Sequence, residues 1–179
     1  RYRQLIHDLA NHRTLIDDES TRSLLASLRI VPTQDGNWAE PANAYWRSDE
    51  LAKTLGEAKR LWVDTSRIPT SRSVTGFLDE LGIRKAPAAS HLVERMIGIA
   101  EAYPPAEDAR RASERTFYAL CANYESSQED GTQPVAISKL AGAVCFPAEG
   151  DAENWHSGGT LYAPFRADAF RSQARILDF

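Results

Sequence analysis

The sequence contains only two cysteines, Cys121 and Cys145, among 179 residues. They are too few and too far apart to supply the ligands of a cysteine-rich zinc site, and a disulfide-stabilised secreted domain would carry more. No apolar run approaches the ~20 residues of a membrane-spanning helix, and no signal peptide opens the chain. These absences predict a cytoplasmic protein without a membrane partner or a metal site.

Positive charge is also scarce. Four lysines and 17 arginines face 25 acidic residues, which gives a formal net charge of −4. A domain that binds nucleic acid usually has a basic face or a high pI, so the composition does not favour nucleic acid as a partner. The apolar content of 42% and the charged content of 26% are typical of a folded globular chain.

Catalytic and phosphate-binding motifs are missing as well. No glycine-rich loop of the kind that cradles a phosphate occurs. Glu153, His156 and Ser157 lie close together after Asp151, but the G-x-S-x-G frame of a serine nucleophile is absent. We therefore expect a solvated turn here, and no catalytic, cofactor-binding or metal-binding residues.

The strongest positive signal is helical periodicity. Apolar spacing predicts helices over about 2–11, 49–56 and 106–124, and further helices after 20, after 71 and between 87 and 103. The helix predicted after residue 20 follows an acidic stretch, which suits a helix N-terminus. Its residues Leu24, Leu25 and Leu28 are expected to be buried. On the helix over 106–124, Arg110 is expected to point outward. The helical middle of the chain covers about 71–124.

Two stretches share a strand–turn–strand pattern. Val31-Pro32 precedes Asp35-Gly36 and Trp38, and Phe146-Pro147 precedes Glu149-Gly150 and Trp155. The tryptophans are 155 − 38 = 117 positions apart, and a glycine after an acidic residue accepts the positive φ of a hairpin turn. The pattern predicts repeat units over about 28–64 and 142–179.

The predicted fold is therefore α+β, with a helical core and two small repeated β-hairpin units. We expect 1–179 to form a single compact fragment. Because the chain enters a helical pattern at Arg1 without a methionine, we expect it to be a piece of a larger protein. Trp38 and Trp155 are expected to close the hairpins over the core, with a ligand-stacking role as the alternative.

The first repeat unit carries a resemblance to a known family. The segments over 30–46 (IVPTQDGNWAEPANAYW), 61–64 (LWVD) and 77–83 (FLDELGI) resemble the region behind the nucleotide-binding domain of sacsin-like proteins. These proteins begin with an ATPase domain of the heat-shock chaperone (GHKL) type, and bacterial members sometimes carry a nuclease-like domain. The resemblance implies that ATP and magnesium bind to the parent protein. The ATP-site motifs do not occur in this chain, so we expect no cofactor here.

These observations favour a non-enzymatic scaffold or coupling domain of a larger sacsin-like ATPase. Its expected partners are other domains of the same polypeptide and a client or partner protein. The candidate interaction residues are Trp38, Trp155, Arg166, Arg171 and Arg175, the arginines because they share part of a predicted helical face.

Two alternatives from other classes stay open. A nucleic-acid-handling domain of a bacterial defence or restriction-type system predicts that Arg166, Arg171 and Arg175 converge with other arginines into one patch. An independent hydrolase predicts a polar pocket with perturbed titratable groups around His156.

Overall fold

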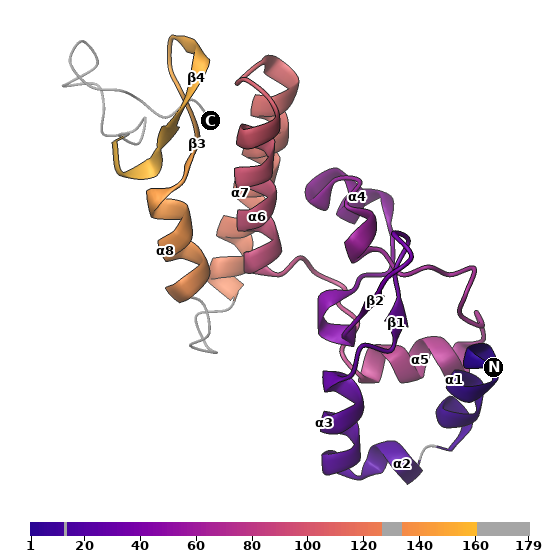
Figure 1. Cartoon of the computed structure of the whole chain (residues 1–179). Coiled ribbons are helices and arrows are strands. Elements are labelled where there is room, and N and C mark those ends of the chain that lie inside the picture. The colour runs from indigo at the N-terminus through magenta and orange to yellow at the C-terminus, as the bar shows by residue number, and fades with distance from the viewer. Residues whose placement is uncertain (13, 127–133, 161–179) are drawn as a thin grey trace. The chain divides into compact units, whose positions relative to one another are not determined.

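The computed structural model describes residues 1–12, 14–126 and 134–160, and within them the fold is α+β with a helical core and two small antiparallel sheets (Figure 1). This confirms the predicted fold class. Contacts between residues divide the chain into two compact units, Arg1–Ala52 with Glu57–Ala86, and Lys53–Gly56 with Pro87–Phe179. None of the helices in the described ranges combines the length and apolar character that crossing a membrane requires.

The first unit is built around helices that pack on a small hairpin. Its elements are α1 (Tyr2–Asn11), α2 (Thr14–Asp17), α3 (Glu19–Ser27), the short turns η1 (Pro41–Asn43) and η2 (Lys59–Leu61), and α5 (Arg72–Glu80). Helix α4 (Asp49–Leu55) begins in this unit. Helices α1 and α5 pack against each other. Their buried apolar residues meet those of the hairpin and form one core, with Ile6 of α1 and Phe77 of α5 among its members.

Side chains cap two of these helices. The Asp18 carboxylate accepts a hydrogen bond of 2.9 Å from the backbone N–H of Thr21 at the start of α3. Ser71 caps α5 in the same way, accepting from the N–H of Val74. A cap oxygen satisfies an N–H that has no partner within the helix. Both helices start within two residues of the predicted positions.

The buried stripe expected on α3 is wrong in two of its three residues. Leu24 is 60% exposed and Leu28 is 43% exposed, while Leu25 packs against the core. Periodicity gives a helix an apolar face, but neighbouring elements decide how much of that face is covered.

The first hairpin joins β1 (Val31–Pro32) to β2 (Trp38–Ala39), with Pro32 opposite Trp38. Its turn contains Gly36 at φ +88°. The segment 61–64 joins the first unit through isolated bridges, which pair Trp62 with Tyr45 and Val63 with Thr33.

The second unit contains two long helices that lie side by side, with α8 and the second hairpin packed on α6 (Figure 1). Its elements are α6 (Ala89–Ala102), α7 (Glu107–Ser126), α8 (Pro134–Gly142), β3 (Val144–Ala148), β4 (Asp151–Ser157) and the short turn η3 (Gly158–Thr160). Helix α8 is not predicted by the sequence pattern. Leu92, Val93, Met96 and Ile99 of α6 are buried, and Phe146 of β3 meets the ring of Phe117 edge to face, with ring centres 5.8 Å apart.

The second hairpin is longer than the first and irregular. Phe146 lies opposite His156, and Ala148 lies opposite Asp151, with a shift in register between these pairs. Gly150 takes φ +77° in the turn. Each unit thus has one hairpin with an acidic residue and a glycine in its turn and a tryptophan in its second strand. The later part of the second repeat, beyond residue 160, lies outside the described residues, so the repeat stays a prediction.

Candidate functional site

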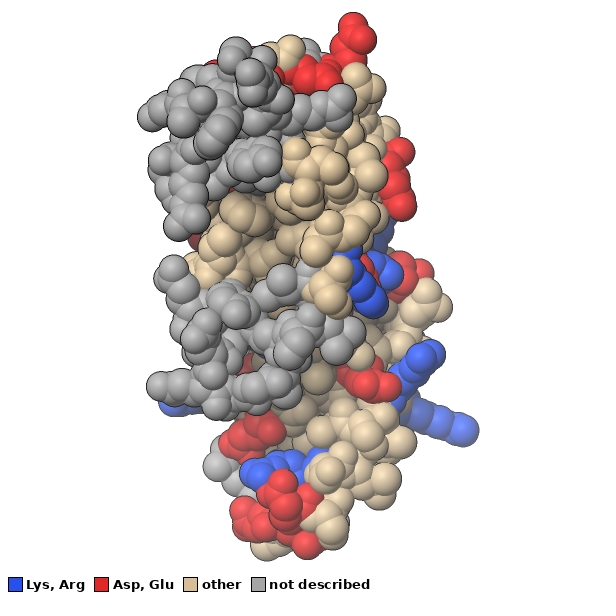
Figure 2. Space-filling view, turned by 90° about the vertical axis from the view of Figure 1, so that its left-hand side faces the viewer, with Lys and Arg blue, Asp and Glu red and all other residues tan. Residues whose placement is uncertain are grey.

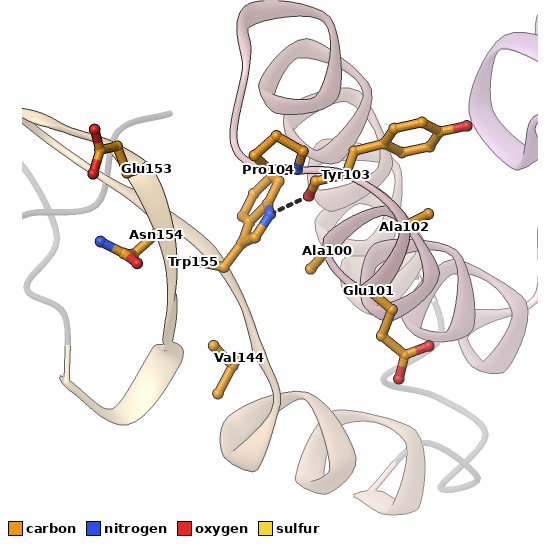
Figure 3. Close-up of a pocket in the computed structure, with 9 residues that line it drawn as sticks. All are labelled: Ala100, Glu101, Ala102, Tyr103, Pro104, Val144, Glu153, Asn154 and Trp155. Atoms are coloured by element: carbon orange, nitrogen blue, oxygen red, sulfur yellow. Dashed lines mark hydrogen bonds between the residues drawn. The ribbon is translucent and has the colours of Figure 1, made fainter.

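The candidate site is a depression in the second unit, between the end of α6 and the second hairpin (Figure 3). It has a volume of about 450 Å³ and is wide open to solvent. Residues 100–104 line one side, and Val144 with residues 153–155 line the other. We call this feature the Trp155 depression.

Trp155 joins the two sides of the depression. Its indole N–H donates a hydrogen bond of 2.8 Å to the backbone carbonyl of Tyr103, as Figure 3 shows. Tyr103 takes an extended backbone conformation because Pro104 follows it, and α6 ends there. The indole N–H of Trp155 is therefore satisfied by a group outside its own hairpin.

The rim of the depression carries acidic groups on opposite sides. Glu101 comes from α6 and Glu153 from β4, and both side chains are exposed (Figure 3). The ring of Tyr103 points away from Trp155. Val144, at the start of β3, leaves 60% of its surface exposed although it is apolar.

A carboxylate in the hairpin turn fixes the strand that carries Trp155. Oδ1 of Asp151 accepts hydrogen bonds from the backbone N–H groups of Glu153 and Asn154, each 3.1 Å long. Its Oδ2 lies 3.0 Å from Nε2 of His156. The bond from the Glu153 N–H, with smaller contributions from Asn154 and His156, lowers the pKa of Asp151.

The solvated turn expected around His156 is wrong. His156 lies within β4 and is only 6% exposed. The register with Phe146 carries its ring inward, and the Asp151 carboxylate satisfies a ring nitrogen there. A histidine close to an aspartate in the sequence is the signal for this pair.

The hydrolase alternative gains no support from these contacts. The Ser157 hydroxyl donates to Thr160, at 3.4 Å. Neighbouring residues of a strand point to opposite faces, so Ser157 does not share the face of His156. Among the described residues, no group of His, Cys, Asp and Glu side chains is arranged to hold a metal ion.

Arg110 of α7 holds the tip of the second hairpin. Its guanidinium donates to the backbone carbonyl of Asp151 at 2.6 Å and to that of Pro105 at 2.8 Å. The expectation that Arg110 points outward is wrong, because the hairpin supplies unpaired carbonyl groups beside this face of α7. Nothing in the periodicity of α7 indicates a partner 41 residues away.

Cys145 lies in the core of the second unit. It is fully buried in β3, and burial raises the pKa of its thiol to about 11. A thiol that stays protonated is a poor nucleophile. Cys145 is therefore a core residue of β3.

Trp38, in the first unit, has neighbours of another kind. Its ring meets the ring of Tyr2 edge to face at 4.8 Å, and the guanidinium of Arg67 lies 4.6 Å from the ring centre. The Tyr2 hydroxyl donates to the carbonyl of Ile30 at 2.6 Å, and burial raises the pKa of this hydroxyl to about 12. These contacts hold the Trp38 ring in place, and 36% of the residue stays exposed.

The three arginines that the sequence analysis singles out, Arg166, Arg171 and Arg175, lie outside the described residues. On the face drawn in Figure 2, the described basic side chains form small separate groups with acidic side chains among them. The described part of this face therefore has no continuous basic area. The nucleic-acid alternative stays a prediction.

No family model matches the sequence, and no match is found among the curated proteins or the solved structures. The inference of function therefore depends on the geometry of the Trp155 depression and on the sequence patterns.

Proposed function

We propose that the chain is a non-enzymatic protein-interaction domain, a scaffold or coupling domain of a larger sacsin-like ATPase, and that the Trp155 depression receives a segment of its partner. The resemblance of 30–46 to sacsin-like proteins supports the proposed parent. The partner is another domain of the same polypeptide or a client protein.

The observation that carries the proposal is the composition of the Trp155 depression. It combines an anchored tryptophan with Val144, an apolar side chain that stays 60% exposed. Tryptophan is enriched at the energetic centres of protein interfaces, and burying the exposed part of Val144 is worth about 1 kcal/mol. Covering such a surface with a partner is therefore favourable in free energy.

The second support is rigidity. The Trp155–Tyr103 bond ties the hairpin to the end of α6, and Arg110 ties the hairpin tip to α7. A surface that is already ordered loses little conformational entropy when it binds. The depression is therefore prepared for binding rather than formed by it.

Site-specific photocrosslinking tests the proposal. The full-length parent protein is expressed in its native host with p-benzoylphenylalanine at position 144. The cells are irradiated with ultraviolet light, and the crosslinked adducts are identified by mass spectrometry. We expect a reproducible adduct with one defined protein segment, inside or outside the same polypeptide.

The matched control carries the crosslinker at Tyr118, which is 55% exposed on α7 of the same unit and does not line the depression. Equal adduct patterns at positions 144 and 118 contradict the proposal. An adduct with nucleic acid at position 144 contradicts it in favour of the nucleic-acid alternative.

A further inference from the structure

We infer that the segment received by the Trp155 depression presents an apolar side chain next to a lysine or an arginine. This inference rests on the proposed function and specifies the chemistry of the partner. The evidence comes from the apolar groups of the depression, from the acidic groups on its rim and from the way Trp155 is held.

The apolar part of the recognition comes from Val144 and the α6 wall. The lining includes Val144, Ala100 and Pro104 beside the indole of Trp155. The depression is open to solvent, and its volume of about 450 Å³ has room for one or two side chains of a peptide that lies along the surface. Because the indole N–H already donates to Tyr103, the ring of Trp155 offers apolar contact rather than a hydrogen-bond donor.

The acidic rim of the depression favours a basic residue in the partner segment, next to the apolar side chain that enters the depression. Glu101 and Glu153 are exposed on opposite sides of the depression, and the described residues form no ion pair with either carboxylate. Among the described residues that line the depression there is no lysine or arginine. A cationic side chain reaches one of these carboxylates while its apolar neighbour enters the depression, so the charges are complementary.

The same rim disfavours phosphate-bearing partners. Nucleic acid binds through the neutralisation of its phosphates by Lys and Arg. The Glu101 and Glu153 carboxylates, which form no ion pair with the described residues, repel such phosphates. A protein segment with a positive charge is therefore the partner class that the rim favours.

Peptide display tests this chemistry directly. A random dodecapeptide library is selected against the full chain, with the variant Val144→Lys as the counter-target. Lysine at this exposed strand position fills the depression with a flexible cation and suits an exposed strand edge. We expect the enriched peptides to carry an apolar residue within two positions of a lysine or arginine.

A charge-neutral variant separates the two parts of the recognition. In Glu101→Gln/Glu153→Gln both changed side chains are exposed, so the fold has no reason to change. We expect an enriched peptide to bind about five-fold more weakly to this variant at low salt, and the difference to shrink as salt increases.

Three results would overturn the inference: no peptide enriched over the Val144→Lys counter-target, enriched peptides without a basic residue, or unchanged binding to the charge-neutral variant. Neutral peptides that need Val144 would leave the proposed function standing and remove only the basic requirement. Failure of the proposed function shows separately, as the absence of a specific adduct at position 144 in the crosslinking experiment.

Discussion

The two hairpins have similar turns, but their tryptophans lie in different surroundings. Each has a glycine at positive φ in its turn, Gly36 at +88° and Gly150 at +77°. Each has an aspartate near the turn whose carboxylate accepts hydrogen bonds from the following backbone, Asp35 from Asn37, and Asp151 from Glu153 and Asn154.

The difference lies in what meets the tryptophan. In the first unit, Tyr2 and Arg67 contact the ring of Trp38. In the second unit, Trp155 is held through its N–H by a helix-end carbonyl, and the space beside it stays open as the Trp155 depression. Trp38 is thus held by two side chains and still leaves 36% of its surface exposed, while Trp155 is held by one polar atom and borders the depression.

Of the variants considered, Arg110→Ala should lower the free energy of unfolding most. The loss should be found in the second hairpin and not in the first. The change removes the donor to the carbonyls of Asp151 and Pro105, and unsatisfied carbonyls in a partly buried place cost about 2 kcal/mol of unfolding free energy. Urea denaturation measures the loss, and hydrogen exchange of the β4 amides locates it.

The control is Arg111→Ala, the next residue on α7. Arg111 is exposed and pairs only with Glu107 one turn earlier, so its removal should change the unfolding free energy by less than ~0.5 kcal/mol. Equal losses in Arg110→Ala and Arg111→Ala would show that Arg110 does not hold the hairpin.

Gly36→Ala and Gly150→Ala should cost the two hairpins similar amounts. A new Cβ meets no atom within 4 Å at either position, so the cost comes only from forcing an L-residue to positive φ, about 1–2 kcal/mol. Thermal unfolding measures both.

Gly98→Ala in α6 provides the control of opposite sign. Its Cβ also meets open space, but its backbone is helical, so alanine should raise stability by up to ~1 kcal/mol. A large difference between Gly36→Ala and Gly150→Ala would mean that the turns are not equivalent.

Substituting phenylalanine for each tryptophan separates ring packing from the N–H bond. Trp155→Phe loses the bond to Tyr103 and should lower the unfolding free energy by about 1 kcal/mol. Trp38→Phe keeps a ring between Tyr2 and Arg67, and should change it by less than ~0.5 kcal/mol. Chemical denaturation compares them, and the reverse order would contradict the distinction between the two tryptophans.

Low pH should reduce the stability that both turns contribute to the fold. This is the smallest of the four effects predicted for the hairpins. The hydroxyl of Thr33 lowers the pKa of Asp35, and the N–H of Glu153 lowers that of Asp151. A carboxyl with a lowered folded pKa stabilises the fold fully above its unfolded value of about 3.9, and this contribution is lost as the pH falls through the lower folded value.

Asp35→Asn and Asp151→Asn test this dependence. Each variant should be less stable than the parent chain at pH 6, and the difference should shrink as the pH is lowered below about 3.9. Urea midpoints at several pH values measure it. A difference that is constant with pH would mean that the charge of the carboxylate contributes nothing.

Local signals in the sequence predicted much of the fold. Asp18 and Ser71 begin their helices with side-chain caps, and Tyr103 ends α6 because Pro104 follows it. Apolar stretches on either side of an acidic residue and a glycine predicted both hairpins. Helix α8 was missed because its short apolar run, preceded by a polar stretch, does not show the periodicity of a two-faced helix.

The sequence predicted only part of the candidate site. Trp155 stood out as a residue type, but Tyr103 was visible only as a helix end, and Val144 only as part of an apolar run. Arg110 and His156 were both assigned to solvent, and both are held by groups of the second hairpin. Their partners depend on how α7 and the hairpin pack, which no local pattern records.

The sequence by itself determined where helices start and stop and where the chain turns, because caps, prolines and turn glycines act within a few residues. Only the tertiary structure decided which apolar side chains remain in water and which tryptophan borders an open surface. Burial depends on elements that are distant in the chain, so Leu24, which the sequence analysis expects to be buried, is exposed in the folded protein, and so is the apolar Val144.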